Sequence, residues 1–337
     1  MHANLRIKNA LRAFAIYIST IFIFYLLFSK INLKGILIAL GNINLEFLTI
    51  ALLVSIIINI FLASDLRRKL LILFKCNLSF REALFIKMGT MPLKLIPGFK
   101  YLDLIQASYL KENYGMPFST GIFLNILAYL ISVVALLIVF LLGFVFYWLF
   151  MPLKFGVIYK EYILIPVIIA ILSLLLFFVF FLNRRILLLI KRNTTSKRSW
   201  LHEAFNKLAN LLLNTPKRKI IFLVLYASVF QSSELIVFYI LSKSLSINIP
   251  FFLIMLYMPL SILISNLPIV VLGLGIREAT ILALFSRYGP IEDILGLGIL
   301  VSFVEHIFPI LLGFFFFVPL INKLRIQLAI KQERACL

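Results

Sequence analysis

Long apolar runs constrain this chain more than any other feature of its sequence. The runs lie at about 14–28, 47–63, 118–150, 162–182, 220–241 and 295–320. A helix of roughly 17–25 predominantly apolar residues can cross the hydrocarbon core of a bilayer. The chain is 63% hydrophobic and 14% charged, whereas soluble domains are about 25% charged. We therefore expect an all-α polytopic membrane protein with about six full spans.

Basic residues gather in short blocks beside these runs and predict the topology. The blocks lie at 6–12, 65–69, 184–219 and 323–334, and the net charge of the chain is +20. Lys and Arg are enriched in the cytoplasmic loops of membrane proteins, so we expect both termini on the cytoplasmic side of a prokaryotic inner membrane. Because such blocks also attract anionic headgroups, membrane lipids are the expected partners, and no nucleic acid is expected.

Two segments are apolar but too interrupted to face lipid. With the basic blocks inside, segment 81–117 must leave the cytoplasm and return to it, and segment 250–291 must enter from outside and return there. Irregular backbone at membrane depth is tolerated only where protein or a wet cavity shields it. We therefore predict two re-entrant helical hairpins that enter from opposite faces.

The two predicted hairpins share one order of features, which suggests an inverted repeat. Both "LIPGFKYLDLIQASYLKENYG" and "LPIVVLGLGIREATILALFSRYG" contain a proline, glycine, a predicted helix and a Tyr-Gly end. Inverted repeats are typical of transporters whose substrate site lies near the midplane, although a match this short could also arise by chance. We expect a single membrane domain, 1–337, with repeats at about 46–183 and 217–322 and a basic amphipathic cytoplasmic linker at 184–216.

The second hairpin contains the strongest candidate for binding an anion. Gly273 and Gly275 allow tight backbone turns just before a helix predicted to start near Ile276. The N-terminus of a helix favours anions such as phosphate, and Arg277 can donate two parallel hydrogen bonds to one. We therefore expect a phosphate-bearing headgroup to bind near Arg277, in a cavity between the hairpins.

Further polar residues lie within predicted spans, namely Gln231, Glu234, Glu305 and His306. Ionisable groups are costly inside a membrane, so they are candidates for a functional site. A structural interpretation is also open, because Glu234 or Glu305 could neutralise Arg277 and His306 could make an interhelical hydrogen bond.

The sequence offers no arrangement typical of an enzyme, a metal site or a cofactor site. Cys76 and Cys336 fit neither a disulfide framework nor a zinc-binding spacing. A nucleophile elbow and a phosphate loop are also missing. We therefore expect no catalytic residue, no metal and no cofactor, and transport is favoured over catalysis.

Two motifs resemble those of a known family. "LP" at 267–268 with "GLGIREA" at 273–279 is similar to the signature of the lysylphosphatidylglycerol synthase transmembrane-region family of flippase-like membrane proteins. "IPGFKYLDLIQASYLKENYG" resembles that family's earlier Pro-Gly motif. Leu272 and Gln106 depart from the pattern, since many members have glycine and arginine there. The family's motif positions, with the neighbouring Lys100 and Asp103, give the expected headgroup-binding residues Pro97, Gly98, Lys100, Asp103, Pro268, Gly273, Gly275, Arg277 and Glu278.

The resemblance implies that the protein moves a lipid-linked headgroup or supports its synthesis. The sequence ends at Leu337 without the soluble aminoacyl-transferase domain of two-domain members, so we expect a stand-alone membrane form. The expected function is translocation or binding of an anionic or polyprenyl-phosphate-linked lipid in cell-envelope lipid or polysaccharide synthesis. The alternative is a membrane-embedded subunit or scaffold of a glycosyltransferase or lipid-modifying enzyme, with a glycosyltransferase as its partner.

Overall fold

The computed structural model describes residues 2–29, 32–96, 101–150, 167–174, 213, 215–266 and 270–336. These described residues are helical with short connections and contain no β-strand. The named helices are α1 (His2–Phe28), α2 (Leu33–Gly41), α3 (Leu45–Phe74), α4 (Phe80–Thr90), η1 (Met91–Leu95), α5 (Tyr101–Tyr114), α6 (Phe118–Phe150), α10 (Lys217–Ser244), α11 (Phe251–Ser265), η3 (Val271–Gly273), α12 (Ile276–Phe285), α13 (Ile291–Ser302), the π turn η4 (Phe303–Ile307) and α14 (Phe308–Cys336).

Within the described ranges, four helical stretches are long and apolar enough to cross a membrane. They are Leu45–Phe74, Phe118–Phe150, Lys217–Ser244 and Ile291–Ile326. They coincide with four predicted spans, so an all-helical, multi-pass membrane protein is confirmed. α1 contains a shorter apolar stretch, Phe14–Leu27, at the first predicted span. The predicted span at 162–182 and the linker at 184–216 lie largely outside the described residues, and the total of six spans stays a prediction.

The outer surfaces of these helices are apolar. Leu149 of α6, Val229 of α10 and Phe315 of α14 are 70%, 69% and 79% exposed. Soluble monomers rarely expose apolar patches of large area. Such side chains are stable against lipid tails, so the exposed faces agree with a membrane environment.

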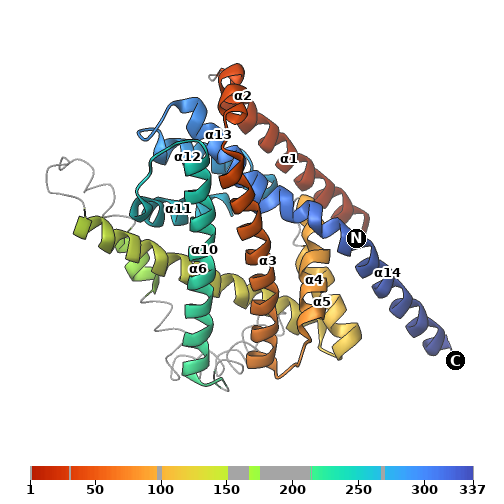
Figure 1. The fold of residues 1–337 in the computed structure, drawn as a ribbon. Helices are drawn as coiled ribbons and strands as arrows, with labels where there is room; N and C mark the ends of the chain where they lie inside the picture. Colours follow the sequence, from red (N-terminus) through yellow and green to blue (C-terminus); the bar gives the residue numbers. More distant parts are fainter. Residues whose placement is uncertain are drawn as a thin grey trace.

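α3 and α10 lie side by side and antiparallel through the middle of the molecule (Figure 1). At one end, the Asn44 N–H donates to the Ser244 carbonyl over 3.0 Å. At the other end, the Arg68 guanidinium lies 4.4 Å from the centre of the Tyr226 ring, a favourable cation–π arrangement. These contacts fix the two helices in register over their full length.

Two broken helical segments pack around this pair. The first comprises α4, η1 and α5, near the end of α3 at Phe74, and the second comprises α11, η3 and α12, near the opposite end of α3 (Figure 1). We call them the first and second hairpin. η1 of the first hairpin contacts η3 of the second. The two hairpins therefore meet at the points where their helices break.

Glycines allow neighbouring helices to pack closely around both hairpins. A Cβ atom on Gly313 of α14 would lie 2.7 Å from the Met88 carbonyl oxygen of α4, and one on Gly143 of α6 would lie 2.6 Å from the Leu256 nitrogen of α11. Small residues are typical of contacts between membrane helices, because they let backbones approach. Each hairpin is thus held against a long helix by backbone-to-backbone contact.

Candidate functional site

Arg277 lies in the first turn of α12 and is almost completely buried. Its side chain is 3% exposed, and Nη2 donates to Ser265 Oγ over 3.4 Å. Nε and Nη1 have no hydrogen-bond partner among the residues that the structure describes. A guanidinium is always charged and carries five donors, and burying it without acceptors is costly. Arg277 therefore presents unused donors inside the protein.

The backbone before α12 adopts conformations that favour glycine. Leu272, Gly273 and Gly275 have φ angles of 57°, 74° and 86°. A Cβ atom on Gly273 would lie only 2.6 Å from the Ser265 carbonyl oxygen. In addition, the Val271 N–H donates to Thr20 Oγ1 of α1 over 3.0 Å. The loop is therefore fixed by steric fit and by a bond to α1, and it aims Arg277 inward.

Glu278 is occupied within the protein. Its Oε2 accepts a hydrogen bond from the Gly275 N–H over 2.5 Å, its Oε1 accepts one from Ser302 Oγ of α13, and the side chain is 1% exposed. A glutamate at the third position of a helix caps its N-terminus in this way. Glu278 thus occupies the Gly275 N–H, a donor at this end of α12 that a bound anion could otherwise use. The guanidinium of Arg277 is the charged donor in the same helical turn.

Polar residues from four elements line a small cavity of about 60 Å³. The lining includes Lys94 of η1, Glu234 of α10 and His306 of η4, beside Asn59 of α3. Each of Lys94, Glu234 and His306 retains some accessible surface. The cavity therefore joins η1 of the first hairpin to the central helix pair and to the break between α13 and α14.

The break between α13 and α14 is a π turn, which places Glu305 and His306 beside the cavity. Ser55 Oγ of α3 donates to the Val304 carbonyl over 2.8 Å and holds the turn against the central pair. Glu305 Oε1 and both ring nitrogens of His306 are buried without a hydrogen-bond partner in the described part of the chain. Single π turns inside helices are frequent at functional sites, and unsatisfied buried polar atoms are unusual.

Electrostatic interactions link the cavity to Arg277. Arg277 interacts with Glu234, Glu305 and Lys94, and Lys94 also interacts with Glu234. Charges interact more strongly where water is scarce, because the local dielectric constant is low. We call these four residues (Lys94, Glu234, Arg277 and Glu305) the central cluster. Among the described residues no ion pair joins them, and Arg277 does not line the cavity itself.

The structure brings several predicted site residues together. Glu234, Glu305 and His306 share the cavity, and Gln231 lies one turn before Glu234 with a buried Oε1 that lacks a described partner. Gly273 and Gly275 shape the loop before Arg277. Asp103 lies on α5, where its carbonyl accepts from Asn125 over 3.4 Å, and it does not line the cavity. The remaining predicted residues, Pro97, Gly98, Lys100 and Pro268, lie outside the described residues. Headgroup binding by any of these residues stays a prediction.

Sequence reasoning did not select Lys94, Ser55 or Asn59, although all three line the cavity. Lys94 follows Lys87 by seven residues in an apolar segment, a spacing that returns to the same face of a helix. That spacing was the one available signal for Lys94. Ser55 and Asn59 are separated by one helical turn within a predicted span, so their polarity on one face was the corresponding signal.

Comparison with known proteins identifies the family. A search of curated proteins gives no match. Residues 12–313 match the family described as lysylphosphatidylglycerol synthase TM region. The match includes all of the central cluster and both hairpins, and it relates the chain to membrane proteins of lipid-related processes. The chain therefore belongs to the lysylphosphatidylglycerol synthase transmembrane-region family.

Proposed function

We propose that the protein binds the phosphate of an anionic or polyprenyl-phosphate-linked lipid between its hairpins and moves that lipid across the inner membrane of a prokaryote. The observation that carries the proposal is Arg277, which is 3% exposed and has two nitrogens without a partner among the described residues. A guanidinium binds phosphate oxygens through two parallel hydrogen bonds. Membership of a lipid-related membrane family supports a lipid as the source of the phosphate.

The hairpins supply the proposed path. We infer that each hairpin is re-entrant, that they enter from opposite faces as an inverted repeat, and that six full spans surround them with both termini cytoplasmic. The contact between η1 and η3 supports this arrangement, because broken helices in inverted-repeat transporters meet near the midplane. A headgroup that reaches this contact from either face would meet Lys94 and Arg277.

The carboxylates of the central cluster suggest how the site is kept stable without lipid. Glu234 and Glu305 interact with Arg277 and can balance its charge, since an unpaired buried charge is strongly destabilising. A bound phosphate would replace them as the counter-charge. Lipid binding would therefore supply acceptors for Arg277 Nε and Nη1, which have no partner among the described residues.

The size of the cavity indicates that the hairpins must separate to admit a headgroup. About 60 Å³ has room for a few water molecules but not for a phospholipid headgroup. Separation of η1 from η3 would open the cavity toward one hairpin at a time. The structure therefore corresponds, in this proposal, to a closed state between two open ones.

Reconstitution in liposomes tests the proposal. Vesicles contain a fluorescent anionic, zwitterionic or polyprenyl-phosphate lipid, and a membrane-impermeant quencher reports the fraction in the outer leaflet over time. We expect wild-type protein to accelerate transfer of at least one phosphate-bearing anionic class and Arg277→Gln to reduce that acceleration at least ~30-fold. The exposed Arg287 of the second hairpin provides the matched control, Arg287→Gln. Transfer rates equal to those of empty vesicles for every class would refute the proposal.

A membrane-embedded transferase subunit is the second candidate. Its support is that Glu234 and Glu305 line one cavity beside His306, since acid–base catalysis requires groups that converge on a substrate. Mass spectrometry of lipids incubated with reconstituted protein and a glycosyltransferase partner tests it. Covalently altered lipid that disappears with Glu234→Gln or Glu305→Gln would favour this candidate over transport.

A further inference from the structure

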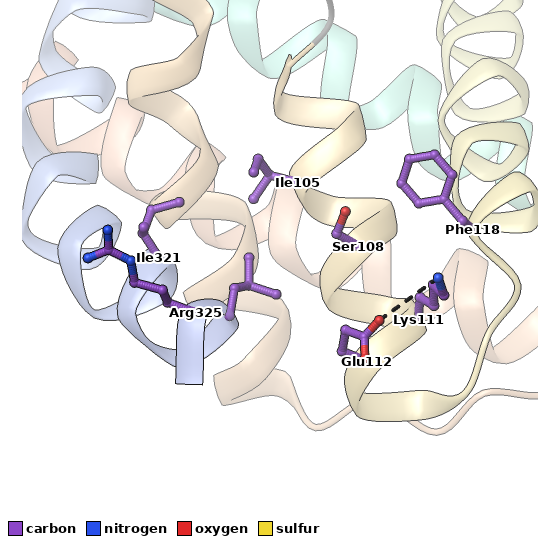
Figure 2. Close-up of a pocket in the computed structure, with 8 residues that line it drawn as sticks. Ile105, Ser108, Lys111, Glu112, Phe118, Ile321 and Arg325 are labelled. Carbon is purple, nitrogen blue, oxygen red and sulfur yellow. Dashed lines mark ion pairs between the residues drawn. The ribbon is translucent and has the colours of Figure 1, made fainter. Parts of the chain in front are cut away.

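A second pocket, distinct from the central cluster, lies between α5, the start of α6 and the end of α14. Its volume is about 500 Å³, and none of its lining residues lines the cavity at Lys94. Figure 2 shows its two kinds of lining residue. Ile105, Phe118, Ile321 and Leu324 supply the apolar lining. The two cations lie at opposite sides of the pocket, Arg325 beside Ile321 and Lys111 near Phe118, with Glu112 between them (Figure 2).

The pocket lies where two helices change from apolar to charged sequence. α14 is apolar through Ile321, and its first charged residues are Lys323 and Arg325. On α6, the apolar run begins at Phe118, a few residues after the charged Lys111 and Glu112 near the end of α5. Such a change marks the boundary between hydrocarbon and headgroups. Because the charges of α14 are basic, this boundary belongs to the cytoplasmic leaflet in the proposed topology.

The charges at the pocket favour an anion. Lys323 Nζ donates to Tyr109 OH over 2.7 Å, which ties α14 to α5 and adds positive charge nearby. Lys111 and Arg325 are both exposed. Glu112 lies 4.0 Å from Lys111, and Glu82 interacts with Lys323. Among the described residues, these three cations therefore face two carboxylates, which leaves one positive charge. An amphipathic ligand with a negative head and an apolar tail therefore matches both kinds of lining residue.

We propose that this pocket binds an anionic phospholipid of the cytoplasmic leaflet. Lys111 and Arg325 would flank its headgroup from opposite sides of the pocket, and the first part of one acyl chain would pack on Ile105 and Phe118. A volume of about 500 Å³ is within the usual range for small-molecule sites and holds the head and upper chain of one lipid. This site is separate from the central cluster, so it does not require that the protein transport lipids.

Fluorescence quenching by brominated lipids tests the site. Trp148→Phe and Trp200→Phe remove the two native tryptophans, and Phe118→Trp places a reporter on the pocket wall. A second single-tryptophan protein carries Phe80→Trp, at the exposed start of α4 and next to Arg81, to report the general accumulation of anionic lipid at the surface. Each protein is reconstituted in vesicles with increasing fractions of brominated phosphatidylglycerol or brominated phosphatidylcholine.

At each tryptophan, the lipid preference is the ratio of the apparent affinities for brominated phosphatidylglycerol and brominated phosphatidylcholine. We expect this ratio to be at least ~5-fold larger at Phe118→Trp than at Phe80→Trp, the factor expected from a single cation near an anionic headgroup. Lys111→Gln with Arg325→Gln should reduce the preference at Phe118→Trp to the level seen at Phe80→Trp. Equal preferences at the two reporters would overturn the proposal, and this comparison needs no charge variant. A preference that survives in the double variant would overturn it as well. Lipid transfer by the central cluster is measured separately, so either proposal can fail alone.

Discussion

The two hairpins differ in how each holds its cation. In the second hairpin, Arg277 follows a loop with three left-handed residues, and the buried carboxylate of Glu278 caps its helix. In the first hairpin, Lys94 lies in a short 3-10 helix, and the cap of α4 is at its far end, where Ser79 Oγ accepts from the Glu82 N–H. The second hairpin therefore holds a rigid cation, and the first contributes a cation on a flexible side chain.

This difference suggests that the second hairpin contributes to both stability and binding, whereas the first contributes mainly to binding. A buried planar guanidinium is preorganised for two hydrogen bonds, whereas an ammonium acts as a point charge on a flexible stem. Substitutions in the second hairpin should therefore disturb both fold and binding. Substitutions in the first hairpin should weaken binding and leave the fold largely intact.

Gly273→Ala should have the largest effect. The new Cβ atom would lie 2.6 Å from a backbone carbonyl at a φ of 74°, so we expect destabilisation by about 3 kcal/mol or more from strain and overpacking. Thermal unfolding of detergent-purified protein measures it. Gly41→Ala is the control, because nothing lies within 4 Å of its Cβ position, and it should change stability by less than about 1 kcal/mol. Equal melting temperatures for both variants would show that the loop is not constrained.

The glutamates in the first turns of α12 and α4, Glu278 and Glu82, should differ next. Glu278→Ala leaves the Gly275 N–H and the Ser302 hydroxyl without their acceptor in a buried site, and we expect a loss of about 2–3 kcal/mol. Glu82→Ala removes a partly exposed carboxylate that accepts from Ser79 Oγ and Tyr114 OH. The Ser79 cap on the Glu82 N–H remains, so we expect a loss of about 1 kcal/mol or less. Chemical denaturation of the two variants under the same conditions gives the comparison. A larger loss for Glu82→Ala would reverse the assignment of the rigid hairpin.

The two cations should differ in binding. Arg277→Gln should reduce transfer of an anionic lipid at least ~30-fold, the effect of about 2 kcal/mol for a buried charge–charge contact. Lys94→Gln should reduce it by a smaller factor, since Lys94 retains accessible surface at the cavity. Initial rates in the liposome assay measure both, and melting temperatures exclude unfolding as the cause. If Lys94→Gln were the more damaging change, the first hairpin would supply the main binding group.

The smallest effect should come from Tyr114 of α5, whose hydroxyl donates to Glu82 Oε2. That hydrogen bond is the main reason that the pKa of Glu82 is lowered from its usual value. A carboxyl whose pKa is lower in the folded state stabilises the fold above its unfolded pKa and loses that effect as the pH falls through the folded pKa. Tyr114→Phe should therefore lower the free energy of unfolding at pH 7 by less than about 1 kcal/mol, because the pair is partly exposed. The melting temperature should fall slightly at pH 7 and should not change at about pH 3. Tyr25→Phe, at an exposed tyrosine, should show no such pH dependence.

Four of the spans and the interruption of the helices in segments 81–117 and 250–291 could be predicted, because hydropathy and charge act over many residues. The run at 118–150 is confirmed as a helix of the same extent, and the interrupted segments 81–117 and 250–291 contain the two broken helical segments. A membrane requires long apolar helices and a bias of basic residues, so these patterns are readable without tertiary contacts. Entry of the hairpins from opposite faces stays a prediction.

The side-chain partners could not be predicted in the same way. Headgroup binding by Glu278 stays a prediction. Its oxygens accept hydrogen bonds from the Gly275 N–H and Ser302 Oγ, and the contact with Ser302 depends on how α13 packs against α12. Lys94 lines the cavity because the 3-10 helix η1 follows directly after α4. Hydrophobic periodicity does not predict the direction of the side chains after such a change of helix type. Glu278 and Ser302 are 24 positions apart. Their contact depends on the packing of two helices, which the local sequence around each residue does not predict.

A double-mutant cycle between Lys94 and Arg277 tests most directly whether the two hairpins share one site. The rate of anionic-lipid transfer is measured for wild type, Lys94→Gln, Arg277→Gln and the double variant, each with its melting temperature. If both cations bind the same phosphate, the double variant should lose little more than Arg277→Gln alone, because coupled residues are not additive. If the two losses simply multiply, Lys94 and Arg277 act independently, and the claim of a single site between the hairpins is contradicted.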